Sequence, residues 1–211
     1  MRYATLIVGM ALAGLLAGCA ALEPVPAPDL APATQTVDAT GALPIMERNG
    51  AGGLPNGWEP WILHPSKRKT RYETRGRNGD TVVWAHADSA ASGLARRLDL
   101  DPAATPWIEW RWRIDALVPG ADNTDRYAED SPVRIVLAFD GDRRKLPVRD
   151  QLFFEQARLL SGGQDMPYAT LMYIWENRQP VGSIITNPNT ARVRKLVVSS
   201  GEAGEIGRAH V

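Results

Sequence analysis

The sequence predicts a mainly β protein: an antiparallel β-sandwich of jelly-roll type with one inserted helix near residues 150–160. Three observations lead to this fold class. Apolar and polar residues alternate in several short runs, which is the period of a strand that buries one face. Glycine, proline, asparagine and aspartate cluster between these runs, where tight turns are needed. Only one segment repeats its apolar residues at helical spacing, so paired strands must supply most of the core.

The clearest strand spans residues 107–115. One face carries apolar side chains (Ile108, Trp110, Trp112 and Ile114), and the opposite face carries charged ones (Glu109, Arg111, Arg113 and Asp115). A second alternating run covers residues 133–140. Further strands are expected over residues 81–87, 93–98, 170–177, 181–185 and 192–199.

Two local signals define a turn and a helix. Asn78-Gly79, inside the turn at residues 77–80, is typical of a two-residue β-hairpin. Asp150 is expected to cap a helix whose apolar stripe contains Phe153, Ala157 and Leu160. Ser161-Gly162-Gly163 is expected to end that helix.

Residues 1–18 have the pattern of a bacterial export signal. Arg2 precedes an apolar stretch that is too short to span a bilayer comfortably. The stretch closes with Leu16, Ala17, Gly18 and Cys19, which resembles the lipobox of bacterial lipoproteins. We therefore expect cleavage before Cys19 and membrane lipid as a partner through the acylated thiol, because several acyl chains give stable anchoring. Ala20 stands where an aspartate would resemble an inner-membrane retention signal, so the expected location is the outer membrane, facing the periplasm.

The rest of the chain divides by composition. Residues 19–53 are rich in proline and alanine and show no persistent period, which is typical of a tether. Residues 54–204 contain the predicted strands and form the expected domain.

Composition excludes several classes of function. The chain has 24 basic and 24 acidic residues, so its net charge of zero argues against a nucleic-acid partner. One cysteine cannot make an intramolecular disulfide or a cysteine-rich metal site, and three histidines leave little for a histidine-based one. We therefore assign no metal ligand, no cofactor and no catalytic residue.

A binding role is the preferred interpretation. The charged face of the 107–115 strand presents Glu109, Arg111 and Arg113, with Arg134 expected nearby. Arginine grips carboxylates and phosphates in a bidentate manner, so this row suits a glycan or an envelope protein with acidic groups. Trp175 and Arg178 complete the candidate ligand-binding set. A solvated sheet face with cross-strand salt bridges is the simpler alternative.

Two other functions stay open. A carbohydrate-active enzyme would use Glu109 or Asp130 with a second carboxylate across a cleft. A structural component of the cell envelope would need no small-molecule ligand and only a flat contact surface.

Several motifs in the predicted domain are similar to those of one bacterial family. They are Ser89-Ala90-Ala91-Ser92-Gly93-Leu94, Pro106-Trp107-Ile108-Glu109-Trp110-Arg111-Trp112, Tyr173-Ile174-Trp175-Glu176-Asn177-Arg178, and Asn187-Pro188-Asn189-Thr190 followed by Arg192-Val193-Arg194. From about Leu54 to Gly201 the chain resembles domain-of-unknown-function family 3047. The resemblance implies a β-sandwich outside the cytoplasm and brings no established activity or catalytic residue.

The resemblance also bears on the C-terminal residues. Members of the family continue through more strands beyond residues 197–201, so we expect the domain to be incomplete at this end. Residues 206–211 match the translation of a sequencing-adapter string. We therefore expect residues 205–211 to be a sequencing artefact.

Overall fold

The structure is a computed structural model that describes residues 4–10, 53–63, 66–77, 80–160, 163, 165–203 and 206–210. The expected lipobox residues Leu16, Ala17, Gly18 and Cys19 and most of the tether lie outside these ranges. The strands are β1 (Ala4–Met10), β2 (Glu59–Trp61), β3 (Arg71–Arg77), β4 (Asp80–His86), β5 (Gly93–Leu98), β6 (Glu109–Arg113), β7 (Val133–Phe139), β8 (Ala169–Glu176), β9 (Ile184–Thr186), β10 (Val193–Ser200) and β11 (Ile206–His210). One α-helix, α1 (Val148–Leu160), follows a short 3-10 turn at Arg143–Lys145.

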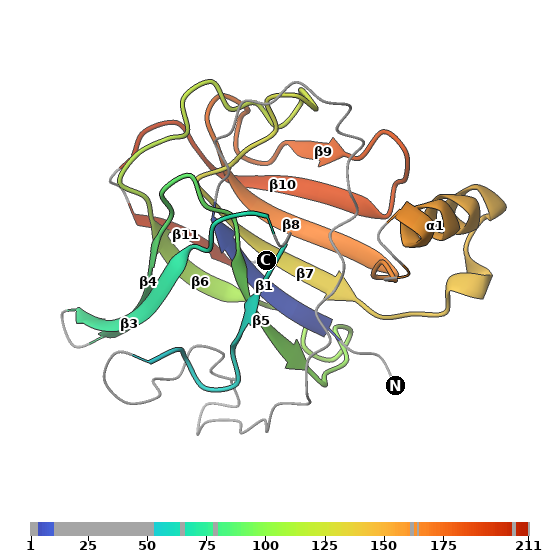
Figure 1. Ribbon diagram of the computed structural model, residues 1–211, viewed down its shortest axis with the longest axis horizontal. Helices are drawn as coiled ribbons and strands as arrows, with labels where there is room; N and C mark the ends of the chain where they lie inside the picture. The colour runs from blue at the N-terminus through green and yellow to red at the C-terminus, as the bar shows by residue number, and fades with distance from the viewer. Residues whose placement is uncertain are drawn as a thin grey trace.

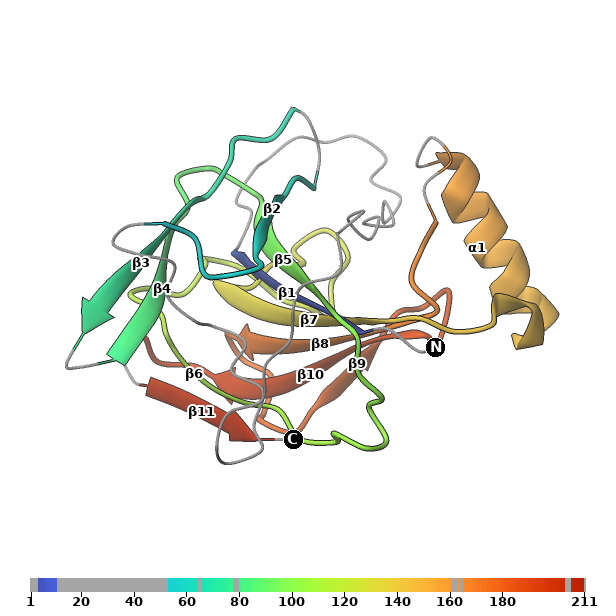
Figure 2. The ribbon, with the colours of Figure 1, turned by 90° about the horizontal axis from the view of Figure 1, so that it is seen from below.

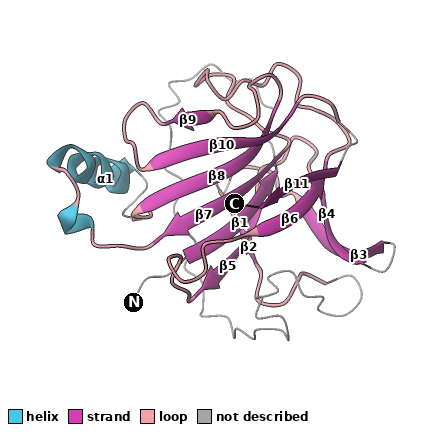
Figure 3. Ribbon diagram, turned by 180° about the vertical axis from the view of Figure 1, so that it is seen from behind, coloured by secondary structure: helices cyan, strands magenta, loops and turns pink. Residues whose placement is uncertain are grey.

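The described chain is mainly β, as predicted (Figure 1). The largest sheet has the strand order β2-β5-β1-β7-β8-β10-β9, and two ribbons, β3-β4 and β11-β6, stand apart from it. Figure 2 shows the β6-β11 ribbon beneath the large sheet, which gives the arrangement two layers. Figure 3 shows α1 beyond one end of the sheet, where it covers neither face.

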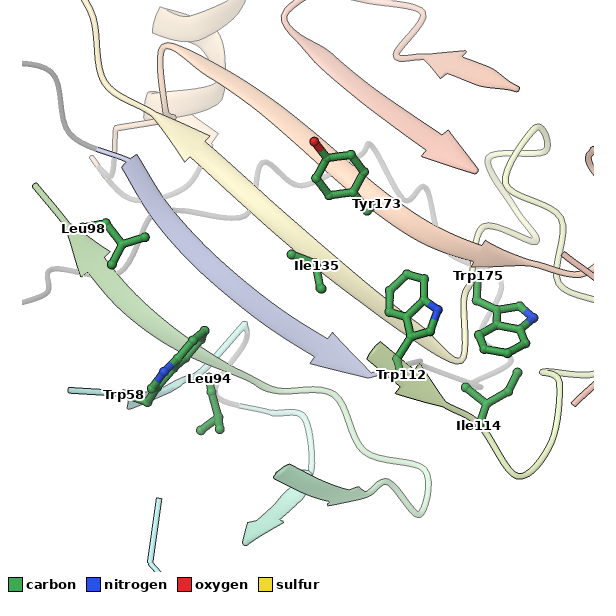
Figure 4. Packing of buried hydrophobic residues seen from close by; sticks show 8 residues of the cluster. All are labelled: Trp58, Leu94, Leu98, Trp112, Ile114, Ile135, Tyr173 and Trp175. Atoms are coloured by element: carbon green, nitrogen blue, oxygen red, sulfur yellow. The ribbon is translucent and has the colours of Figure 1, made fainter. Parts of the chain in front are cut away.

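Alternating residues on β6 join the two layers. Trp112 is 8% exposed and lies 6.1 Å, between ring centroids, from Trp175 on β8. Trp110 lies 4.8 Å from the ring of Tyr173, also on β8. The predicted apolar face of this strand is therefore confirmed as the face that packs against the sheet. Figure 4 shows the core around these contacts, to which β5 and β7 contribute Leu94, Leu98 and Ile135.

Other local predictions are confirmed or need correction. The hairpin at residues 77–80 is confirmed by the pairing of Arg77 with Asp80, which joins β3 to β4. Asp150 does not cap α1, because the helix begins two residues earlier, at Val148. Its carboxylate instead accepts a 2.8 Å hydrogen bond from the Thr190 hydroxyl.

Strand boundaries and directions also differ in places. The strand predicted over residues 181–185 is displaced, because β9 covers only Ile184–Thr186 after a turn at Gly182, whose φ is +90°. The sheet is not antiparallel throughout, since β8 and β10 run parallel. The strands β2, of three residues, and β3, of seven, were not predicted, because neither shows a long run in which apolar and polar residues alternate.

The position of β1 is the largest difference from the sequence-based expectation. Ala4–Met10 belongs to the expected export signal, yet it lies in the large sheet between β5 and β7. It pairs antiparallel with both neighbours, from Ala4 opposite Leu98 and Phe139 to Gly9 opposite Gly93 and Arg134. Across the described residues, we found no helix with the length and hydropathy that a membrane span requires.

Gly141 lies near α1, at a position where a larger side chain would clash with the ring of Tyr168. A Cβ atom at this position would lie 2.6 Å from Cγ of the Tyr168 ring, which packs with Phe154 of α1 in a second core cluster. We expect Gly141→Ala to lower the free energy of unfolding by about 1–3 kcal/mol, because the ring must shift. Gly76→Ala is the matched control, since nothing lies within 4 Å of a Cβ atom there. Urea unfolding of both variants measures the difference, and equal midpoints would show that Tyr168 moves without cost.

Candidate functional site

The exposed side of β6 presents Glu109, Arg111 and Arg113, and Trp107 lies two residues before the strand; we call these four residues the β6 row. All four are exposed, and Trp107 is 76% exposed despite being a large aromatic residue. The three residues within β6 share one side because residues two apart on a strand point the same way, while the half-buried Trp110 and the buried Trp112 between them pack against β8. The charged face of the predicted strand is therefore confirmed as solvent-facing.

The charge of Arg113 is weakly held. Arg113 lies 3.5 Å from Asp115, and both side chains are substantially exposed, at 42% and 88%. Exposed pairs of this kind contribute at most about 1 kcal/mol to stability. A ligand carboxylate or phosphate can therefore displace Asp115 at little cost. Trp107 was not among the predicted site residues, although its position in the same alternation was the signal that could have identified it.

Arg134 lies apart from the β6 row. The β6 strand pairs with β11 and not with β7, so the expected adjacency of Arg134 is corrected by the sheet topology. The Arg134 guanidinium instead lies 3.5 Å from the carboxylate of Asp130, and only 22% of its side chain is exposed.

The other two predicted residues are also separated from the β6 row. Trp175 is 2% exposed, and its indole N–H donates a 3.1 Å hydrogen bond to the carbonyl of Gly201. It therefore serves the core and presents no face to a ligand. Arg178 is exposed just after β8, where its backbone N–H donates to Glu176 at 2.6 Å.

A buried polar cluster surrounds the end of β8, and we call it the Glu176 network: Asn123, Asp130, Ser131 and Glu176. The Glu176 side chain is 1% exposed and accepts hydrogen bonds from the backbone N–H groups of Asn123, Arg178 and Gln179, at 2.9, 2.6 and 3.2 Å. The Asn123 amide also donates to Glu176, to the Asp130 carbonyl and to the Ser131 hydroxyl. These hydrogen bonds connect the loop that contains Asn123, before β7, to the end of β8.

The protonation of Glu176 follows from these contacts. Burial raises the pKa of its carboxyl, but hydrogen bonds from Arg178, Asn123 and Gln179 stabilise the ionised form. The net effect holds the pKa of Glu176 below its ordinary value of 4.5. A general acid needs the opposite shift, so Glu176 is poorly suited to proton donation.

A buried lysine lies near this network. Lys195 of β10 is 7% exposed, and its ammonium group is 2.6 Å from the Glu129 carboxylate. Burial lowers the pKa of Lys195, the nearby Arg134 charge acts in the same direction, and Glu129 and Glu176 oppose both. The charges compensate one another locally, which is typical of a cluster that holds a loop in place.

Among the described residues, few metal-ligating side chains and carboxylates are placed to bind a metal ion or to act together as acid and base. In this part of the chain, no three His, Cys, Asp or Glu side chains gather closely enough to hold a metal. Glu109 is exposed in the β6 row, whereas the buried Asp130 carboxylate accepts from the Ser131 N–H and contacts Arg134. Glu176 was recognised in the sequence only as an available carboxylate at a strand end, and its burial could not be predicted because it depends on a loop that is distant in the chain.

Comparison with known proteins gives one result. The family model described as Protein of unknown function (DUF3047) matches residues 56–210. Among curated proteins and among solved structures, no match to the chain was found. The matched segment contains every described strand from β2 to β11 and both candidate sites. The chain therefore belongs to the DUF3047 family of proteins of unknown function.

Proposed function

We propose that this chain is an exported lipoprotein, held in the outer membrane through acylated Cys19, whose β-domain binds an acidic glycan in the periplasm. The anchor rests on the sequence of residues 1–19. The binding role rests on the β6 row, where an exposed tryptophan just before the strand is followed by two exposed arginines at alternating positions.

The chemistry of the β6 row matches this ligand class. An exposed indole stacks on the apolar face of a sugar ring, and burying it there removes unfavourable contact with water. A guanidinium forms paired hydrogen bonds with a carboxylate or phosphate on the same or the next sugar. Because strand side chains two residues apart are about 6.5–7 Å apart, three alternating positions span roughly two sugar units.

The enzyme alternative has weaker support. Glu109 shares its exposed row with Arg111 and Arg113 and has no described partner carboxylate held across a cleft. The pKa of Glu176 is lowered, mainly by backbone hydrogen bonds working against burial. A hydrolase that breaks glycosidic bonds would need a carboxyl group shifted in the other direction.

The binding proposal predicts a charge-dependent loss of affinity. Full-length protein extracted from membranes would be titrated with uronic-acid and phosphorylated oligosaccharides and with neutral oligosaccharides of the same length. We expect Arg111→Ala/Arg113→Ala and Trp107→Ala each to weaken acidic-glycan binding at least about tenfold, or roughly 1.4 kcal/mol. Wild-type binding should also weaken as salt rises, because the contacts are exposed.

Arg149→Ala is the matched control, because it removes an exposed arginine from α1, far along the chain from β6. It should bind like the wild type. Equal affinity of the wild type and the double variant for every acidic glycan would refute the β6 row as the ligand site. Absence of binding to the whole panel would instead favour the structural role in the envelope.

A further inference from the structure

The helix α1 carries apolar side chains on two opposite faces. Its inner face buries Phe154 and Ala157 in a core cluster. On the opposite face, Val148, Leu152 and Leu159 follow one another at intervals of four and seven residues, which places them in one line along a helix. We call these three residues the α1 stripe. A helix that is apolar on opposite faces is normally covered on both.

The α1 stripe is open to solvent in the described part of the chain. Its three residues are between 66% and 74% exposed, and Leu160 beside them is 68% exposed. No other described element exposes as many large apolar residues. The helix lies beyond one end of the large sheet, away from both of its faces (Figure 3). A contiguous exposed apolar surface of this kind marks a contact with a protein or a membrane.

The charges around the α1 stripe favour a negatively charged surface. Each carboxylate between residues 142 and 165 has a partner, in the pairs Asp142–Arg144, Glu155–Arg158, Asp165–Arg143 and Asp150–Thr190. The pair of Glu155 matters most, because this residue lies on the same face as the stripe. Lys145 and Arg149 are exposed, and among the described residues neither forms an ion pair with a carboxylate. Two cations therefore lie uncompensated beside the stripe.

This combination fits a lipid surface. An apolar line flanked by lysine and arginine is typical of helices that lie in the membrane interface. The apolar side chains enter the boundary of the acyl chains, while the long cationic side chains reach the headgroups. A membrane is also close at hand if Cys19 is acylated, and this step rests on the proposed function.

We propose that the α1 stripe docks on an anionic phospholipid surface, that of the membrane which holds acylated Cys19. The helix axis then lies parallel to the membrane, and its thirteen residues extend along about 20 Å of the surface. The domain has a fixed orientation at the membrane and does not swing freely on its tether. The β6 row belongs to a different layer from α1, so docking of the helix does not require the row to be covered (Figure 2).

A fluorescent label on the α1 stripe is the direct probe. Cys19 is the only cysteine of the chain, so Leu152→Cys introduces the only free thiol of the acylated protein. The full-length variant would be extracted from membranes, labelled with bimane, and reconstituted into vesicles of phosphatidylcholine with about one third phosphatidylglycerol. Two quenchers report on its surroundings: acrylamide in the water, and a nitroxide on the acyl chains of the lipid.

The matched control is Val181→Cys. Val181 is also apolar and 64% exposed, and the neighbouring Gly182 bonds to Val197, whereas the other end of β10 packs near α1 through Val193. We expect acrylamide to quench the label at position 152 at least about fivefold less than the label at position 181. The nitroxide lipid should quench only the label at position 152. Adding Lys145→Glu should reduce that quenching at least about twofold, because it reverses a charge that faces the headgroups.

Three results would overturn the inference while the lipid anchor stands. Equal acrylamide quenching at the two positions would show that the stripe stays in water. Protection of position 152 from both quenchers would show that polypeptide covers the stripe, either another part of this chain or a second copy. Equal nitroxide quenching on vesicles of phosphatidylcholine alone would remove the requirement for anionic lipid.

Failure of the anchor gives a different result. A membrane-extracted chain that begins at Met1 with an unmodified Cys19 would refute the anchor alone, and mass spectrometry would detect it. Cys19→Ala would then remove the second thiol, and the same two labels would test the α1 stripe on the same vesicles.

Discussion

Replacing Glu176 by alanine is expected to lower the free energy of unfolding by about 3–5 kcal/mol, as removal of one member of a buried charged network does. The change would leave three backbone N–H groups without their acceptor and would remove one of the three hydrogen bonds of the Asn123 side-chain amide. Each unsatisfied buried donor costs about 1–3 kcal/mol before relaxation. Chemical denaturation with both fluorescence and circular dichroism would measure the loss.

Two further variants test whether this loss of stability comes from the buried hydrogen bonds of Glu176. Glu155→Ala removes an exposed carboxylate of α1 that pairs with Arg158, and it should change stability by no more than about 0.5 kcal/mol. Glu176→Gln keeps one carbonyl oxygen as acceptor and should cost less than alanine. A loss for Glu176→Ala no larger than that for Glu155→Ala would contradict the assigned role of the Glu176 network.

The same network predicts how stability depends on pH. The pKa of Glu176 is lower in the folded chain than its ordinary value of 4.5, so the unfolded chain binds the proton more readily. Its contribution to stability is therefore present above pH 4.5 and is lost as the pH falls through the folded-state pKa. The Glu176→Gln variant should lose less stability than the wild type over this acidic interval.

Replacing Cys19 by alanine is expected to abolish acylation and to move the protein from the membrane fraction to the soluble fraction. The reason is that each buried methylene of an acyl chain contributes about 0.8 kcal/mol to anchoring, and several chains are lost together. Metabolic labelling with a fatty-acid probe, followed by fractionation, measures both effects.

Ala20→Asp is the matched control for the anchor. It leaves the thiol in place and introduces the residue that resembles an inner-membrane retention signal. We expect this variant to keep the fatty-acid label and to move from the outer to the inner membrane. Labelling that persists in Cys19→Ala would refute lipidation at this residue, and an unchanged location of Ala20→Asp would refute the sorting interpretation.

Local periodicity was sufficient to predict the fold class and one of the two sites. The alternation over residues 107–115 identified the inward-facing tryptophans and the exposed charges, because both follow from the two-residue period of a strand. The Asn78-Gly79 hairpin was likewise a local property, confirmed by the pairing of its flanking residues.

Features that depend on distant segments could not be predicted. The alternation of β7 did not reveal that β6 pairs with another strand, so Arg134 was placed in the wrong neighbourhood. Nothing in the apolar run of β8 distinguished Glu176 as buried, since its partner Asn123 comes from a loop at a separation of 53 residues. The parallel pairing of β8 with β10 was invisible for the same reason.

The N-terminal peptide of protein extracted from outer membranes provides the most direct test of the account, because the proposed lipid anchor requires a chain that begins at an acylated Cys19. Mass spectrometry is predicted to find a mature chain that begins at Cys19 with acyl chains attached, and no peptide from residues 4–10. A membrane-extracted chain that begins at Met1 with an unmodified Cys19 would contradict it.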